Sequence, residues 1–270
     1  MKRFHLVLAM AALTALSCSD RKTAATAGME EPEEEPLPER FENDDLPKAA
    51  DEIFDDFVYY FASNEHLQRR RICFPLRMRA ADGERLIGEE EWTMDSLFMT
   101  TGEYMLILDH ADQRSQLGDS SLTTVTVEKI VFGGESVRQY VFVRNDGRWM
   151  LDNIREQTLD ENGDASFLTF YHAFAGDSAF QHNSLSREIA FSGPDPDDDF
   201  SHIEGFFTPD SWEAFAPELP RDSIYNVVYT PQASNATEKT VFVCGIASGQ
   251  EIELTFRRKK GRWKLAQLTL

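Results

Sequence analysis

The stretches DGRWML at residues 146–151 and KGRWKL at residues 260–265 are two copies of one pattern, 114 residues apart. A second pattern, three phenylalanines at helical spacing, also occurs twice with an offset of 113 residues, at Phe54, Phe57 and Phe61 and at Phe167, Phe170 and Phe174. Two unrelated patterns that share nearly the same offset indicate an internal repeat. The sequence therefore predicts two tandem domains, at residues 51–160 and 161–270.

Each copy is predicted to begin with a helix and to end in strands. Phe54, Phe57, Val58 and Phe61 fall at positions i, i+3, i+4 and i+7, which form the apolar stripe of an amphipathic helix. The last third of each copy is rich in β-branched and aromatic residues and is divided by glycine-containing turns, which is typical of hairpins. A helix followed by an antiparallel meander predicts an α+β domain, with the helix packed on a curved sheet.

The first 18 residues predict export and lipid attachment. Two basic residues precede an apolar run of 11 residues from Leu6 to Leu16, which is too short to cross a bilayer and is typical of a secretory signal. Ser17 and then Cys18 follow, and Cys18 resembles the lipobox cysteine of bacterial lipoproteins, although Ala15 stands where that family usually has leucine. We therefore expect residues 1–18 to be a lipoprotein signal peptide and Cys18 to be acylated. The alternative is an ordinary cleaved signal with a coincidental cysteine.

Residues 19–50 are predicted to be a disordered acidic tether. The stretch EEPEEEP at residues 30–36 has no apolar periodicity, and its like charges repel one another. An acidic run can also bind calcium or a basic partner, but a solvated spacer is the simpler interpretation. The formal net charge of the whole chain is −20, which argues against nucleic acid as a partner because phosphate binding needs clustered Lys and Arg.

The helix, the divergent middle and the closing strands at residues 146–151 and 260–265 resemble the nuclear transport factor 2-like superfamily, whose cone-shaped α+β domains often end in this way. The chain as a whole is similar to tandem-domain lipoproteins of unknown function from Gram-negative gut anaerobes. This resemblance implies two cone-like domains and places any site at the mouth of a cone, between helix and sheet. It does not imply an activity, because such cones serve as isomerases, dehydratases, ligand binders and association modules.

Aromatic residues near these mouths are the pocket candidates. Trp92 and Tyr104 in the first copy are expected to correspond to Trp212 and Tyr225 in the second, and Tyr60 lies on the predicted first helix. Large aromatic side chains supply much of the contact area in ligand pockets.

Catalytic residues are harder to assign. The ketosteroid isomerases of this superfamily pair a carboxylate base with tyrosine and protonated aspartate donors. The nearest equivalents here are Tyr60, Asp109 and His110, but no spacing connects them, and the second copy has Thr230-Pro231 in place of Asp109-His110. We therefore treat these three residues as weak candidates, expect the polar ones to face water, and assign no catalytic residue.

No metal or cofactor site is predicted. The histidines show no His-x-x-x-His pattern, and no cysteine pair has zinc spacing. The acidic residues 195–199 begin like a calcium loop but have Phe200 and Phe206 where that loop needs glycine and glutamate. Cys73 and Cys244 can form a disulfide in an exported chain, although two free thiols are the simpler interpretation.

These patterns predict a non-catalytic lipoprotein of the cell envelope that binds a small ligand or a partner protein through cone-like pockets. One alternative is an enzyme that uses tyrosine and carboxylate acid–base chemistry in one cone. Another is a structural subunit of an envelope complex, with both cones filled by side chains. An open apolar cavity would favour ligand binding or catalysis, whereas filled cones would favour association.

Overall fold

The computed structural model describes residues 48–195, 198–230 and 235–270. The first repeat comprises η1 (Lys48–Asp51), α1 (Phe54–Ser63), α2 (Glu65–Arg70), β1 (Ile72–Ala80), β2 (Gly83–Ile87), η2 (Glu89–Glu91), η3 (Leu97–Thr100), β3 (Glu103–Leu108), η4 (Ala111–Gly118), β4 (Thr124–Val131), β5 (Ser136–Asn145) and β6 (Arg148–Thr158). The second repeat comprises η5 (Leu159–Glu161), α3 (Ala165–Gly176), α4 (Ser178–Asn183), β7 (Leu185–Asp195), β8 (Asp198–Phe207), η6 (Pro209–Ser211), α5 (Trp212–Phe215), β9 (Ser223–Val228), β10 (Glu238–Gly245), β11 (Glu251–Lys259) and β12 (Arg262–Thr269). The predicted α+β class is visible in this order, and helices precede strands in both halves of the chain.

The two phenylalanine stripes form the buried faces of α1 and α3, and their contacts repeat closely. Phe54 meets Trp149 edge to face with ring centroids 5.1 Å apart and an interplanar angle of 78°. Phe167 meets Trp263 in the same way at 5.2 Å and 77°. Edge-to-face packing is a preferred geometry for aromatic pairs. The sequence equivalence of the two Gly-Arg-Trp motifs is therefore an equivalence of packing as well.

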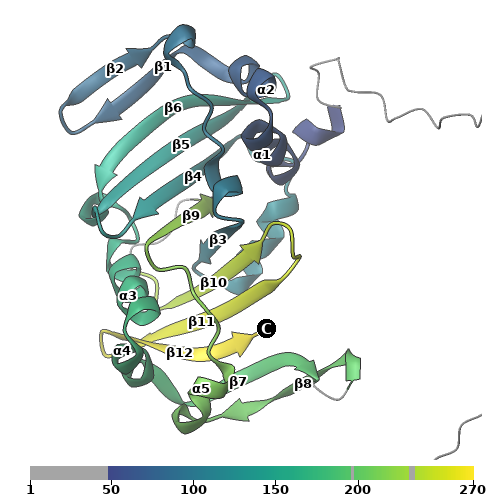
Figure 1. Ribbon diagram of the computed structural model, residues 1–270, viewed down its shortest axis with the longest axis vertical. Coiled ribbons are helices and arrows are strands. Elements are labelled where there is room, and N and C mark those ends of the chain that lie inside the picture. The colour runs from purple at the N-terminus through teal and green to yellow at the C-terminus, as the bar shows by residue number, and fades with distance from the viewer. Residues whose placement is uncertain (1–47, 196–197, 231–234) are drawn as a thin grey trace, which may run out of the picture. The chain divides into compact units, whose positions relative to one another are not determined.

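All twelve strands belong to one sheet, in the order β2-β1-β6-β5-β4-β9-β3-β10-β11-β12-β7-β8 (Figure 1). Most neighbours are antiparallel, as the hairpin signals predict. Three pairs are parallel instead, namely β1 with β6, β12 with β7, and β3 with β9. The predicted purely antiparallel sheet is thus a mixed sheet.

The repeats exchange strands at the centre of this sheet. Strand β9 of the second repeat pairs with β4 of the first, with Val227 opposite Val127. Strand β3 of the first repeat pairs with β10 of the second, with Ile107 opposite Val241. Between them, the side-chain oxygen of Asn226 on β9 accepts a hydrogen bond of 3.0 Å from the main-chain N–H of Ile107 on β3. Each half of the sheet therefore contains a strand from the other repeat.

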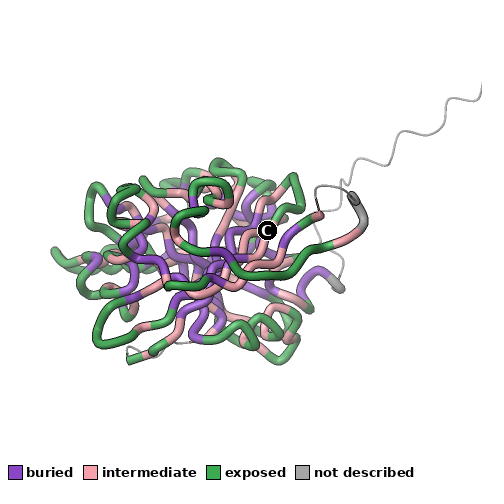
Figure 2. The backbone as a smooth tube through the Cα atoms, turned by 90° about the horizontal axis from the view of Figure 1, so that it is seen from below, coloured by how far each residue is buried: buried purple, intermediate pink, exposed green. Residues whose placement is uncertain are grey.

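The exchanged strands are buried on both faces. On β3, Leu106 and Leu108 belong to the hydrophobic cluster that packs on α1. Met105 and Ile107 belong to the cluster that packs on α3. Since successive side chains of a strand point to opposite faces, α1 and α3 cover opposite faces of the same sheet (Figure 1). Figure 2 shows the buried segments gathered in the interior, with exposed loops around them.

The structure thus has one continuous sheet where the sequence predicted two separate cone-like domains. All of the described residues fall in one compact unit. Near residue 160, η5 leads from β6 into α3 within this single unit. Local patterns do not predict strand exchange, because it depends on pairing between residues more than 100 positions apart. The predicted signal peptide, Cys18 and residues 19–47 lie outside the described residues.

Candidate functional site

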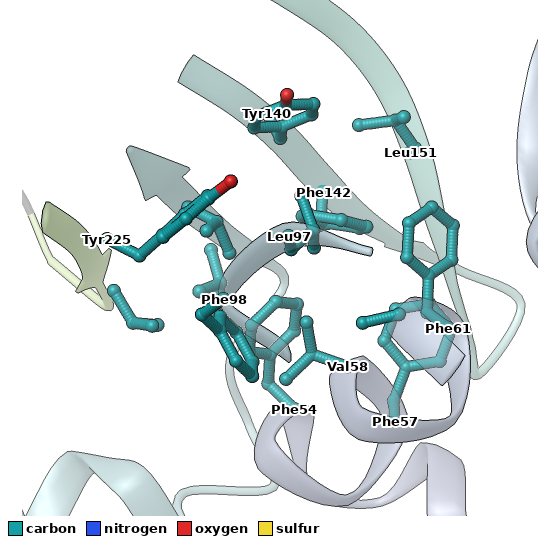
Figure 3. Close-up of a cluster of buried hydrophobic side chains, with 14 of the residues drawn as sticks. Phe54, Phe57, Val58, Phe61, Leu97, Phe98, Tyr140, Phe142, Leu151 and Tyr225 are labelled. Carbon is teal, nitrogen blue, oxygen red and sulfur yellow. The ribbon is translucent and has the colours of Figure 1, made fainter. Parts of the chain in front are cut away.

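The spaces between helix and sheet, where the resemblance placed a site, are filled by side chains. Over α1, the rings of Phe54, Phe57, Phe61 and Phe142 contact one another at centroid distances of 5.1 to 6.0 Å (Figure 3). All four rings are at most 2% exposed. A comparable aromatic cluster packs on α3. One void of about 20 Å³ lies beside Trp263 and has room for a single water molecule.

Two of the predicted pocket residues, Trp92 and Trp212, are parts of the core. Their exposed fractions are 7% and 3%. The indole N–H of Trp92 donates to the side-chain oxygen of Gln68 at 2.9 Å. The indole N–H of Trp212 donates to Gln181 at 2.8 Å, in the same geometry. The two tryptophans thus occupy equivalent positions, and each fixes the end of a short helix.

The predicted correspondence of Tyr104 with Tyr225 is wrong by one residue. Strands β3 and β9 begin at Glu103 and Ser223, so Ile224 is the equivalent of Tyr104. Both tyrosines lie instead on the same face, where they contact Phe98 at 5.2 and 6.3 Å between ring centroids. The two tyrosines share this face because the strand exchange brings β9 beside β3, with Met105 opposite Asn226.

The three weak catalytic candidates make separate contacts. Asp109 is buried, and its carboxylate lies 2.8 Å from the Nζ atom of Lys239. His110 is exposed, with its Nδ1 atom 3.5 Å from the Glu238 carboxylate. Tyr60 is 49% exposed on α1. The expectation that Asp109 faces water is therefore wrong, because it is one member of a buried ion pair.

That ion pair is part of a polar network at the strand exchange. Lys239 on β10 is 2% exposed and contacts Asp164, just before α3, at 2.5 Å. Burial raises the pKa of Asp164, and the charge of Lys239 opposes this shift. Glu128 on β4 accepts hydrogen bonds from the side-chain amides of Asn162 at 2.9 Å and Asn226 at 3.1 Å. Because the network joins β10, β9 and β4 across both repeats, we interpret it as a structural clamp.

A second polar cluster contains the closest approach to a tyrosine–carboxylate pair. The hydroxyl of Tyr229, at the end of β9, donates a hydrogen bond to the Asp55 carboxylate on α1. Burial raises the pKa of Asp55 to about 6, the Tyr229 hydrogen bond opposes this shift, and the nearby Asp56 adds to it. These residues are 174 positions apart, and no local pattern of the sequence connects them.

Cys244 lies near this cluster and is not an activated thiol. Burial and the negative charge of Glu251 raise its pKa to about 12. A nucleophilic cysteine needs the opposite shift, because the thiolate is the reactive form. Glu251 is itself bound by the guanidinium of Arg114. Cys73 and Cys244 are both free thiols, as the sequence favours, with Cys244 buried and Cys73 only partly so.

A large hollow lies on the outer face of the second repeat. It has a volume of about 860 Å³ and is lined by β7, β11 and β12. We call it the basic groove, because six cationic residues line it, namely Arg187, Arg257, Lys259, Lys260, Arg262 and Lys264. Phe206, which is 78% exposed, lies at its side. The sequence predicts a strand end and a turn for the basic run at residues 257–260 but indicates no function for it.

The described residues provide neither a metal cluster nor a membrane-spanning helix. No group of three or more His, Cys, Asp or Glu side chains there is placed to hold a metal ion. No helix in the described part of the chain is long and apolar enough to cross a bilayer.

Comparisons with known proteins agree with the fold. The family model described as "Domain of unknown function (DUF4348)" matches residues 33–269. An NTF2-like protein from Bacteroides fragilis, known from a crystal structure, is 38% identical to the chain, with a TM-score of 0.75. The similarity covers 83% of this chain and 98% of the other. No curated protein matches the chain. A family match over most of the chain, together with this structural similarity, shows that the chain belongs to the DUF4348 family and has an NTF2-like fold.

Proposed function

We propose that this protein is a non-catalytic binding protein of the cell envelope that recognises a partner protein through its outer surface. The observation that carries the proposal is the filling of both helix-covered faces by aromatic side chains. Ligand sites are usually concave and partly preformed, with volumes of ~300 to 1,000 Å³. The basic groove falls in that range and lies instead on the outside of the sheet.

A search for apolar ligands tests whether the interior is closed. The full chain is titrated with a fluorescent apolar dye and screened by thermal shift against small hydrophobic molecules. We expect no saturable binding to the wild-type protein. Phe142→Ala should create an internal cavity and serves as the positive control, since buried apolar cavities bind small apolar molecules. Saturable binding to the wild-type protein that Phe98→Ala abolishes would contradict the proposal.

The proposed membrane attachment rests on the sequence of residues 1–18 and needs its own test. Changing Cys18 to Ala should abolish acyl labelling and move the protein from the membrane fraction to the soluble fraction. Two or three acyl chains suffice for stable anchoring, whereas one does not. A wild-type protein that is exported but unlabelled and soluble would refute lipid attachment without affecting the proposed binding function.

The enzyme alternative keeps one specific observation in its favour, the hydrogen bond between Tyr229 and the Asp55 carboxyl group, whose pKa is raised by burial to about 6. A carboxyl group tuned in this way is suited to proton transfer near neutral pH. This alternative predicts a turnover that falls by ~100-fold or more in Asp55→Asn and Tyr229→Phe but persists in Tyr60→Phe.

A further inference from the structure

The basic groove is unusual because the chain around it is strongly acidic. The formal net charge is −20, yet six cations line this one hollow, with Glu188 as the acidic residue among its lining side chains. A cluster of positive charges on one face of a negatively charged chain creates a local field that attracts anions.

Strand register sets four of these cations in two directly opposed pairs. Arg257 on β11 is opposite Lys264 on β12, and Lys259 is opposite Arg262. The residues between them along the ladder point the other way, as Trp263 does into the core. The four cations therefore share the outer face. Like charges directly opposite one another on a sheet are destabilising, so this array has a cost in the unbound protein.

The first repeat shows that the fold does not need this array. Its equivalent ladder positions are occupied by the pairs Val143–Met150 and Asn145–Arg148. The inward pair between these positions is the same in both ladders, Arg144–Trp149 in the first and Arg258–Trp263 in the second. Four cations in the second repeat thus correspond to a single cation in the first. A difference confined to the outer face, with the packing face retained, points to a role in binding.

Four of the six cations that line the basic groove are available to a partner. Arg257 pairs with Glu238 at 2.8 Å, and the ammonium group of Lys264 donates to the main-chain oxygen of Asn183. Within the part of the chain that the structure describes, Arg187, Lys259, Lys260 and Arg262 are in no ion pair.

The size and surroundings of the groove favour a narrow, elongated anion. A volume of about 860 Å³ is far larger than a single carboxylate or phosphate needs. A membrane surface or a nucleic-acid duplex is broad and would also bring negative charge against other parts of this chain, whose formal net charge is −20. A single extended chain contacts the groove alone and avoids most of that repulsion, because charges more than ~10 Å apart are largely screened at physiological salt.

We propose that the basic groove binds an extended acidic segment of a partner protein. Alternate residues along a strand are ~6.6 Å apart, which is the spacing of Arg257 and Lys259 and of Arg262 and Lys264 along their own strands. Carboxylates at alternate positions of an extended peptide have the same spacing. Phe206 at the side of the groove offers an apolar contact. This inference rests on the proposed function, since it names the chemical class of the partner.

Peptide binding by the purified full chain tests the proposal by fluorescence anisotropy. The probe is a labelled peptide of about eight residues in which glutamate alternates with serine, matching the alternation of an extended strand. A second peptide has the same composition but carries its glutamates in one block. We expect the alternating peptide to bind at least fivefold more tightly, and its affinity to fall as salt is raised. The Lys259→Gln/Arg262→Gln double variant should weaken binding by at least tenfold.

The matched control is the Arg85→Gln/Arg148→Gln double variant, which removes the same charge from the first repeat and includes the position equivalent to Arg262. It should change the dissociation constant by less than twofold, and both double variants should melt as the wild type does. Equal losses in both variants, or no preference for the alternating peptide, would overturn the proposal. Tighter binding of anionic phosphatidylglycerol vesicles or of a single-stranded oligonucleotide through Lys259 and Arg262 would overturn it too. A ligand bound in the interior would contradict the proposed function but not these peptide results.

Discussion

The hydroxyl group of Tyr229 donates a hydrogen bond to the carboxylate of Asp55, and this bond joins the first residue after β9 of the second repeat to α1 of the first. Tyr229 is 4% exposed and meets Phe54 edge to face at a centroid distance of 6.3 Å. The pair therefore lies where the exchanged strand packs against the helix of the other repeat. Burial raises the pKa of Tyr229 well above its ordinary value, so the hydroxyl stays a donor over the accessible pH range.

The raised pKa of Asp55 predicts a pH dependence of stability. Its folded value is about 6 against an ordinary value of 3.8, so the folded state binds more protons than the unfolded state between these values. The contribution is fully present below pH 3.8 and is lost as pH rises through 6. The shift corresponds to about 3 kcal/mol at most. Asp55→Asn should therefore raise the free energy of unfolding at about pH 8 and change it little at about pH 4.

Urea denaturation of both proteins at the two pH values measures this difference directly. Asp112→Asn, at an exposed position of η4, is the matched control and should behave as the wild type at both. If Asp55→Asn is equally destabilising at both pH values, the ionised carboxylate is a net stabiliser and the assignment fails.

The strand exchange predicts that the two repeats do not fold alone. Residues 51–160 lack β9, which covers β4, and residues 161–270 lack β3, which covers β10. Each fragment would expose a strand edge and part of its aromatic core. We expect neither fragment to melt cooperatively by itself and expect a one-to-one mixture to recover a cooperative transition. Calorimetry and sedimentation measure both outcomes.

A full chain cleaved at an inserted protease site within residues 160–164 is the control for this experiment. It should stay associated and keep most of its stability, because cleavage there leaves every strand pair in place. Cooperative melting of either isolated fragment would show that the repeats are independent domains.

Trp149 and Trp263 should contribute similarly to stability. They are 1% and 7% exposed and pack on equivalent phenylalanines. Truncation of a buried tryptophan to alanine costs ~3 to 5 kcal/mol, so we expect losses in that range at both positions. They should add within ~0.5 kcal/mol in the double variant, since the two side chains belong to different clusters. Denaturant titration measures the loss at each site and in the double variant, with Trp→Phe as the milder comparison at each site. A loss below ~1 kcal/mol at either site would show that the two tryptophans are not equivalent.

Tyr60→Phe and Asp109→Asn should have different effects on stability, although the sequence grouped the two residues as weak catalytic candidates. Tyr60→Phe removes an exposed hydroxyl and should change the free energy of unfolding by less than ~0.5 kcal/mol. Asp109→Asn removes one carboxylate partner of the buried Lys239 and should cost ~1 to 3 kcal/mol. Asp164, the second carboxylate beside Lys239, limits the loss. Urea titration measures both changes. If Asp109→Asn leaves the free energy of unfolding unchanged, Asp109 is not part of the structural clamp.

Local patterns predicted the elements of this fold but not their partners. The phenylalanine stripes and the hairpin turns specify α1, α3 and the closing strands because helical and strand periodicity are properties of neighbouring residues. Pairing of β3 with β10 depends on residues far apart. The continuous apolar run from Tyr104 to Leu108 is typical of a strand buried on both faces, and it is the one local sign of the central position of β3.

The candidate site was still less accessible to sequence reasoning. The run of basic residues at 257–260 is visible in the sequence. Only the strand register separates Arg257 and Lys259, on the outer face, from the half-buried Arg258, which lies over the ring of Trp263 on the opposite face. The alignment of these cations with Arg262 and Lys264 also depends on the tight turn between β11 and β12, where Gly261 has a φ of 77°. The Asp55–Tyr229 pair has no local signal at all.

The exchanged strands also set the order of events during biosynthesis. The ribosome completes the first repeat at about residue 160, but β4 still lacks one of its two neighbours and β3 lacks both until residues 223–245 have been synthesised. Every nascent chain passes through a stage with unpaired strand edges, which are the surfaces that seed aggregation. A premature stop codon in the second half would leave a product stalled at that stage. The cell would have to dispose of such a fragment, because no surviving half could act on its own.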